Sequence, residues 1–74
     1  MKVEIDTNVF LAVKNKEENA ESCEKILECI EAGSLSGAVS AIVPAEVLVE
    51  FYQNGEITEA GEFVKKITQS YEIR

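Results

Sequence analysis

The chain has 74 residues, enough for one small domain, and 46% of them are hydrophobic, which is ordinary for a globular fold and argues against disorder. The net charge is −7, from seven basic and fourteen acidic residues. Because nucleic-acid affinity rests largely on Lys and Arg, this composition argues against a basic phosphate-binding face. A metal cation or a partner must supply positive charge wherever the chain meets a polyanion.

Sequence features bearing on location all favour a cytoplasmic protein. Glu4 and Asp6 come soon after Met1 and Lys2, so no signal peptide is expected, and no apolar run is long enough to span a bilayer. Cys23 and Cys29 lie six residues apart on one predicted helix, too far to bridge each other, and the chain has no His to complete a Cys/His metal site. We therefore expect two buried or half-buried free cysteines.

Residues 2–6 predict a first β-strand with polar and apolar side chains in alternation. Val3 and Ile5 would point to one face, and Lys2 and Glu4 to the other. A central parallel strand is usually apolar on both faces, so this alternation indicates an open face or an exposed edge.

Two helices are expected after this strand. The first runs from Asn8 to about Lys14, with Asp6 or Thr7 as its cap. The second runs from about residue 17 to residue 32 and ends at Gly33. Apolar residues at helical spacing mark the buried stripe of the second helix: Ala20, Cys23, Ile26, Leu27 and Ile30.

The second half of the chain predicts a strand, two helices and the start of another strand. A strand over residues 35–40 would run parallel to the first, because a two-helix crossover separates them. Ser40 would cap a helix over residues 41–53, and Thr58 would cap one ending near residue 70. Residues 71–74 begin a third strand. The inward positions of the two helices are Val47, Leu48, Phe51 and Tyr52, followed by Ala60, Phe63, Val64 and Ile67.

Asp6 and Glu46 are the candidate metal ligands. Asp6 is the only Asp in the chain and closes the first strand, whereas Glu46 lies in the first turns of the helix after the second strand. If the strands are parallel neighbours, both carboxylates sit at one edge of the sheet, and such a pair without His or Cys suits Mg²⁺ or Mn²⁺. The alternative is structural, because an Asp that caps a helix and a Glu near a helix N-terminus are both routine.

Two stretches resemble the PIN-domain family. Val3-Glu4-Ile5-Asp6-Thr7-Asn8-Val9-Phe10 is similar to the opening signature of that family, an apolar strand leading into Asp-Thr-Asn. Val39-Ser40-Ala41-Ile42-Val43-Pro44-Ala45-Glu46-Val47 is similar to its strand-Ser-apolar-Ala-Glu stretch, which carries the second acid. The two-helix spacer between the stretches also fits.

The resemblance implies an α/β fold, a short parallel β-sheet with flanking helices, and the activity of a metal-dependent ribonuclease like the toxins of toxin–antitoxin pairs. Asp6 and Glu46 would hold Mg²⁺ or Mn²⁺ and serve catalysis, with RNA as substrate. Thr7 and Asn8 are the substrate-side candidates. The Thr7 hydroxyl would hold Asp6 or a phosphate, and Asn8 would chiefly shape the turn.

The resemblance covers residues 1–74 as a single PIN-like domain but spans only the N-terminal half of the family domain, so the chain is expected to be truncated or a fragment. Family members carry further acids beyond this half, and in their strand order the first strand is central. Here its outer edge would be open, which predicts a homodimer or a domain-swapped assembly. A non-catalytic module that binds itself, an antitoxin or another protein partner is therefore the alternative to a ribonuclease.

Overall fold

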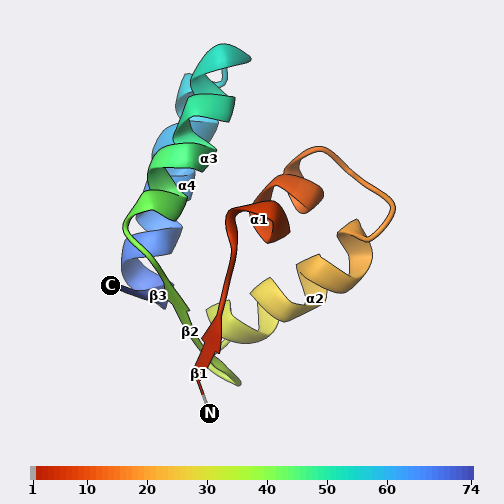
Figure 1. Ribbon diagram of the computed structural model, residues 1–74, viewed down its shortest axis with the longest axis vertical. Helices are drawn as coiled ribbons and strands as arrows, with labels where there is room; N and C mark the ends of the chain where they lie inside the picture. The colour runs from red at the N-terminus through yellow and green to blue at the C-terminus, as the bar shows by residue number, and fades with distance from the viewer. Residues whose placement is uncertain (1) are drawn as a thin grey trace.

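The computed structural model describes residues 2–74, an α/β chain in which four helices alternate with three parallel strands (Figure 1). The elements in chain order are β1 (Lys2–Glu4), α1 (Thr7–Lys14), α2 (Ala20–Glu31), β2 (Ser36–Val39), α3 (Ile42–Gln53), α4 (Ile57–Ser70) and β3 (Tyr71–Ile73). The expected α/β class is confirmed, and so is the parallel pairing of the first two strands. No helix within residues 2–74 is long and apolar enough to cross a membrane.

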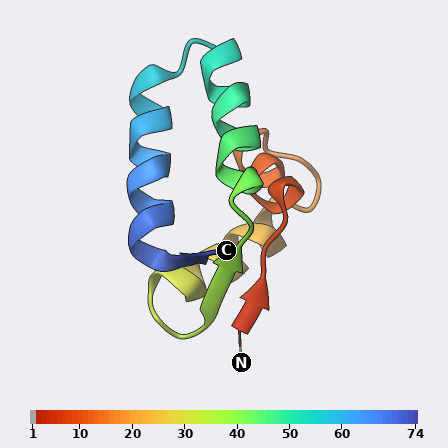
Figure 2. The same cartoon turned by 60° about the vertical axis from the view of Figure 1, so that its left-hand side comes forward.

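The sheet has the order β1-β2-β3, with Val3 opposite Gly37 and Gly37 opposite Tyr71 (Figure 2). β2 is therefore the central strand, and β1 and β3 are the two edges of the sheet in the described part of the chain. The expectation of an exposed first strand is confirmed. Its Ile5 N–H donates to the Ala38 carbonyl at 2.9 Å, so alternate residues of β1 direct their backbone groups away from β2.

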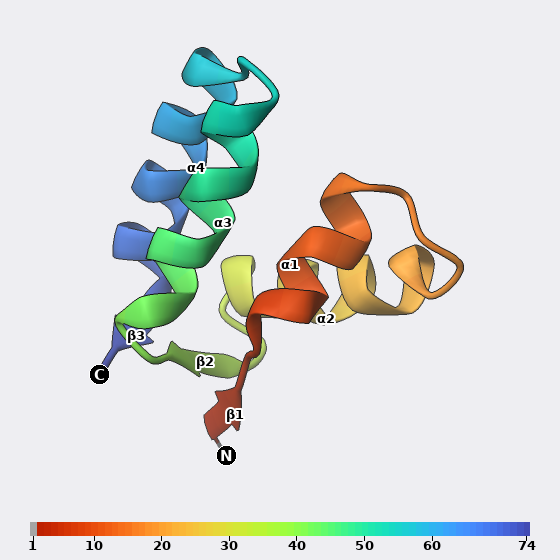
Figure 3. The ribbon, with the colours of Figure 1, turned by 45° about the horizontal axis from the view of Figure 1, so that its top comes forward.

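The four helices lie on one side of the sheet, and no helix covers the other side within residues 2–74 (Figure 3). On the open face Lys2 contacts Glu72 at 2.9 Å, while Arg74 contacts Glu72 at 2.8 Å and Glu4 at 3.2 Å. The hydrogen bond from Lys2, and then that from Arg74, lowers the pKa of the Glu72 carboxyl. This network crosses all three strands and accounts for the polar positions that the alternation in β1 predicted.

The core lies between the sheet and the helices. Val39, Val47 and Ile67 are fully buried, and burying each such side chain contributes about 1.5–3 kcal/mol. The Phe10 ring meets the Tyr71 ring edge-on at 5.6 Å between centroids. Phe10 also packs edge-on against Phe63 at 5.4 Å, so this aromatic contact joins α1 to α4.

Several element boundaries differ from the expected ones. β1 ends at Glu4 rather than at Asp6, because Asp6 already occupies the N-cap position of α1. α2 begins at Ala20 rather than at residue 17, with Asn19 at its N-cap position, and the turn before it includes Lys16 with a φ of 53°. Gly33 ends this helix as expected, with a φ of 85° that favours glycine.

The expected side-chain caps are wrong. Asp6 takes the N-cap position of α1, but neither its side chain nor that of Thr7 caps the helix. Ala41 rather than Ser40 is the N-cap residue of α3, and Ser40 contributes only its backbone carbonyl, which accepts the Val43 N–H. Glu56 rather than Thr58 precedes α4.

Four side chains expected inside are exposed. Tyr52 is 56% exposed because it lies more than a quarter turn from the buried Val47 side of α3. Ile26 and Val64 lie at the margins of the buried stripes of α2 and α4 and are about 40% exposed. Cys23 is buried as expected, but Cys29 is exposed on the outer side of α2.

Candidate functional site

Asp6 lies where β1 gives way to α1. Its backbone is extended, with φ −89° and ψ 157°, and its carbonyl accepts the Val9 N–H at 3.1 Å. Because the side chain makes no capping hydrogen bond and is exposed, its carboxylate remains available at the carboxyl-end edge of the sheet. The N-terminus of α1 adds a partial positive charge there, which favours an anionic side chain.

Glu46 is joined to the start of α1 by a single short hydrogen bond. The Thr7 hydroxyl donates to Glu46 Oε1 at 2.6 Å, which is the short end for a bond from a hydroxyl to a carboxylate. Thr7 is buried, whereas the rest of the Glu46 side chain reaches solvent. The hydroxyl therefore fixes one carboxylate oxygen of Glu46, and the other has no hydrogen-bond partner in the part of the chain that the structure describes. It was expected to hold Asp6 or a phosphate, and it holds Glu46 instead.

The candidate residues line one shallow cavity of about 480 Å³. Asp6, Thr7 and Asn8 form its α1 side, and Glu46 and Val49 form its α3 side. The structure therefore brings together all four residues that the sequence singled out. No Lys or Arg lines this cavity within residues 2–74, so nothing there neutralises the two carboxylates.

The donor set fits an open site for a hard cation better than a closed one. No group of three or more His, Cys, Asp or Glu side chains that could hold a metal exists among residues 2–74. Mg²⁺, however, is commonly bound through one or two carboxylates, with water and phosphate oxygens at its other positions. Asp6 and Glu46 supply such a pair, and the fixed oxygen of Glu46 reduces the side-chain entropy lost on binding.

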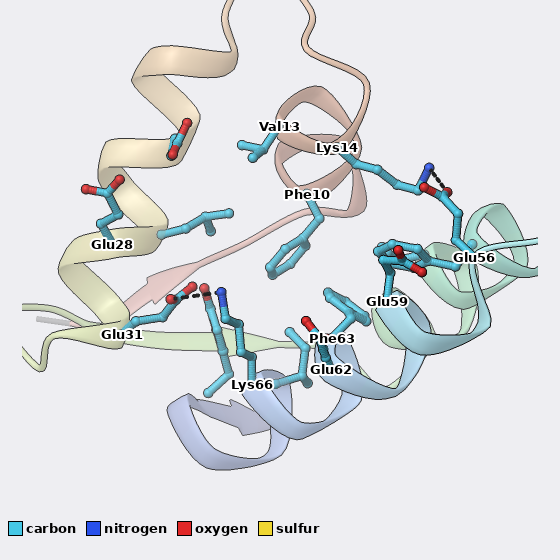
Figure 4. Close-up of a pocket in the computed structure, with 16 residues that line it drawn as sticks. Phe10, Val13, Lys14, Glu28, Glu31, Glu56, Glu59, Glu62, Phe63 and Lys66 are labelled. Atoms are coloured by element: carbon cyan, nitrogen blue, oxygen red, sulfur yellow. Dashed lines mark ion pairs between the residues drawn. The ribbon is translucent and has the colours of Figure 1, made fainter. Parts of the chain in front are cut away.

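A second and larger cavity, of about 550 Å³, lies between α1 and α2 on one side and α3 and α4 on the other (Figure 4). Lys14 closes one side of it by contacting Glu56 at 2.7 Å and by lying 5.0 Å from the centre of the Phe51 ring. The hydrogen bond from Lys14 lowers the pKa of the Glu56 carboxyl. Burial, with a smaller effect from the Glu31 charge, raises the pKa of Tyr71 to about 12.

Sequence reasoning missed this second cavity. Its only signal is a run of glutamates at helical spacing on α2 and another on α4, and either run alone is what a solvated helix face looks like. That the two runs face each other depends on how the helix pairs pack on the sheet.

No protein-family model, no curated protein and no solved structure matches this chain.

Proposed function

We propose that the chain is a PIN-type, metal-dependent ribonuclease in ancestry and chemistry, with Asp6 and Glu46 as the metal ligands. One observation carries the proposal. The two carboxylates line the same cavity, after two neighbouring parallel strands, at the edge of the sheet where α/β proteins bind ligands. The order of strands and helices and the two signature stretches around Asp6 and Glu46 support the same class.

Four residues of the cavity have assigned roles in this proposal. Asp6 and the second oxygen of Glu46 would hold Mg²⁺ or Mn²⁺, and such an ion would supply positive charge to offset a phosphate and would lower the pKa of a bound water. Thr7 orients Glu46 through the 2.6 Å hydrogen bond. Asn8, exposed in the first turn of α1, borders the place where an RNA phosphate would lie.

Cleavage of labelled single-stranded RNA with Mn²⁺ or Mg²⁺ tests the proposal. We expect metal-dependent cleavage by the wild type and a loss of at least about 100-fold in Asp6→Asn, because a metal ligand is removed. Glu50→Gln is the matched control, since it removes the same charge from α3 outside the cavity. Equal cleavage by wild type and Asp6→Asn would identify a contaminating nuclease, and no cleavage by either would refute the enzymatic function.

The open edge of β1 favours a second candidate function, that of a non-catalytic PIN-derived module that assembles with itself or a protein partner. Because Ile5 donates to Ala38, Val3 and Ile5 direct their backbone groups to β2, and Lys2 and Glu4 direct theirs outward. Unpaired edge groups of this kind form additional strand pairs with another chain.

Light scattering at high protein concentration tests the second candidate. Glu4→Pro removes an outward N–H without removing a bond to β2, so we expect it to dissociate a β1-paired assembly. Ile73→Pro is the matched control, because it removes an outward N–H from β3 at the opposite edge. A wild type that stays monomeric, or equal effects of the two prolines, would contradict pairing through β1.

A further inference from the structure

The larger cavity, which shares no residue with the one around Asp6, has the make-up of a ligand site. Figure 4 shows the Phe10 and Phe63 side chains in it, between the helix pairs, and Leu27 and Val47 also line it. Its volume of about 550 Å³ falls within the range of about 300–1,000 Å³ that is typical of small-molecule sites. Apolar and aromatic lining of this kind binds an apolar body.

The charge around this lining is one-sided. Six Glu and two Lys line the cavity, and both Lys are already paired, Lys14 with Glu56 and Lys66 with Glu31. The carboxylates of Glu28 on α2 and Glu62 on α4 have no ion-pair partner within residues 2–74, and neither do those of Glu24 and Glu59. Carboxylates without a counter-charge therefore flank an apolar lining on two sides.

Tyr71 provides an independent observation. Its side chain lines the cavity and is only 7% exposed, yet its hydroxyl is buried and has no hydrogen-bond partner among residues 2–74. Buried hydroxyls nearly always have a hydrogen-bond partner. An unpaired one marks a place where a bound molecule can accept its hydrogen bond. A ligand with an acceptor oxygen would satisfy it.

We propose that this cavity binds an organic cation, an amine or guanidine carried on an apolar or aromatic body. The body lies on Phe10 and Phe63, and the cation lies at the exposed rim of the cavity, among the unpaired carboxylates of α2 and α4. Two ion pairs join the helix pairs on either side of Phe10 in Figure 4, from Lys14 to Glu56 and from Lys66 to Glu31. They limit the length of the occupant, which favours a small molecule over a helix laid along the whole groove.

Binding to the full chain is measured by titration calorimetry and amide NMR with two probes of the same body, phenylbutylamine and phenylbutanoate. We expect the amine to bind at least about tenfold more tightly than the carboxylate, and to shift the signals of Phe10, Phe63 and Tyr71. Equal affinities, no binding of the amine at millimolar concentration, or shifts confined to other residues would overturn the proposal.

Two variants of equal net charge distinguish amine binding in this cavity from nonspecific attraction of the amine to an acidic protein. The double variant Glu28→Gln/Glu62→Gln should weaken amine binding by about fivefold or more. The control Glu17→Gln/Glu18→Gln, in the exposed turn before α2, should leave it within about twofold. Equal losses in the two variants would overturn the proposal.

The role of Tyr71 has its own test. Phenoxypropylamine differs from phenylbutylamine by an ether oxygen in place of one methylene. We expect the ether to bind the wild type about threefold more tightly and to lose that advantage in Tyr71→Phe. An advantage that is absent from the wild type, or that persists in Tyr71→Phe, would refute the assignment of the hydroxyl as a ligand donor.

Discussion

Gly37 at the centre of β2 is where the packing of the sheet is most easily tested. A Cβ placed there would lie 2.8 Å from Ile30 Cδ1, 2.9 Å from Ile30 Cγ2 and 3.1 Å from Tyr71 Cδ2. Carbon atoms in contact normally lie about 3.5–4.0 Å apart. Gly37→Ala therefore forces α2, or its Ile30 side chain, to move away from the sheet.

The cost follows from overpacking. An extra carbon in a packed core typically lowers the free energy of unfolding by about 1–3 kcal/mol. The lower conformational entropy of Ala in the unfolded chain raises it again by about 0.4–1 kcal/mol. We therefore expect Gly37→Ala to lower the free energy of unfolding by about 1–2 kcal/mol, measured by urea denaturation followed by circular dichroism. For a chain of this length the whole stability is of the order of 4–11 kcal/mol, so the loss is easily measured.

Two further variants decide whether the contact with Ile30 is the cause. Ile30→Val removes Cδ1, so in a double-mutant cycle it should reduce the cost of Gly37→Ala by about 0.5 kcal/mol or more. Gly61→Ala is the control, because within residues 2–74 no atom outside the adjoining backbone of α4 lies within 4 Å of a Cβ there, and it should stabilise α4 by up to about 1 kcal/mol. A Gly37→Ala chain as stable as the wild type would refute this account of the packing.

Two more predictions concern buried hydroxyls. Thr7→Val keeps the side-chain shape but removes the hydroxyl that bonds Glu46, so the free energy of unfolding should fall by about 1 kcal/mol in urea denaturation. For Tyr71, whose pKa is about 12, the unfolded chain releases the proton first, so stability is retained below about pH 10 and lost between about pH 10 and pH 12. The loss amounts to at most about 3 kcal/mol and is absent from Tyr71→Phe.

Both predictions have controls. Thr68→Val removes an exposed hydroxyl that bonds only carbonyls of its own helix, and it should change stability by less than about 0.5 kcal/mol. An equal effect of Thr7→Val would show that the bond to Glu46 contributes little. Because other groups also titrate at high pH, the wild type is compared with Tyr71→Phe at each pH, and parallel curves would contradict the burial of the phenol.

The sequence predicted the features that short-range pattern controls. The alternation of Val3 and Glu4 indicated the edge strand, and Gly33 marked the end of α2. The positions of Asp6 and Glu46 after two strands expected to be parallel neighbours predicted that they would lie at one edge of the sheet, and there they line one cavity. The edge strand and the end of α2 each follow from one periodicity or one backbone conformation, whereas the approach of Asp6 to Glu46 also required β1 and β2 to be neighbouring parallel strands.

The features that the sequence did not predict depend on tertiary packing. Ser40 and Thr58 are good caps by residue type, yet α3 and α4 begin elsewhere. The partner of the Thr7 hydroxyl depends on how α3 packs against α1, and the acidic cavity depends on how two helix pairs face each other. The exposure of Tyr52 likewise follows from which side of α3 the other helices cover.

Titration with Mn²⁺, followed by the line widths of amide NMR signals, tests the central claim most directly, because a bound paramagnetic ion broadens only nearby signals. We expect the signals of Asp6, Thr7, Asn8 and Glu46 to broaden first, and the effect to disappear in Asp6→Asn but not in Glu50→Gln. Broadening that begins at the glutamates of α2 and α4, or that is unchanged in Asp6→Asn, would contradict a metal site at the carboxyl-end edge of the sheet.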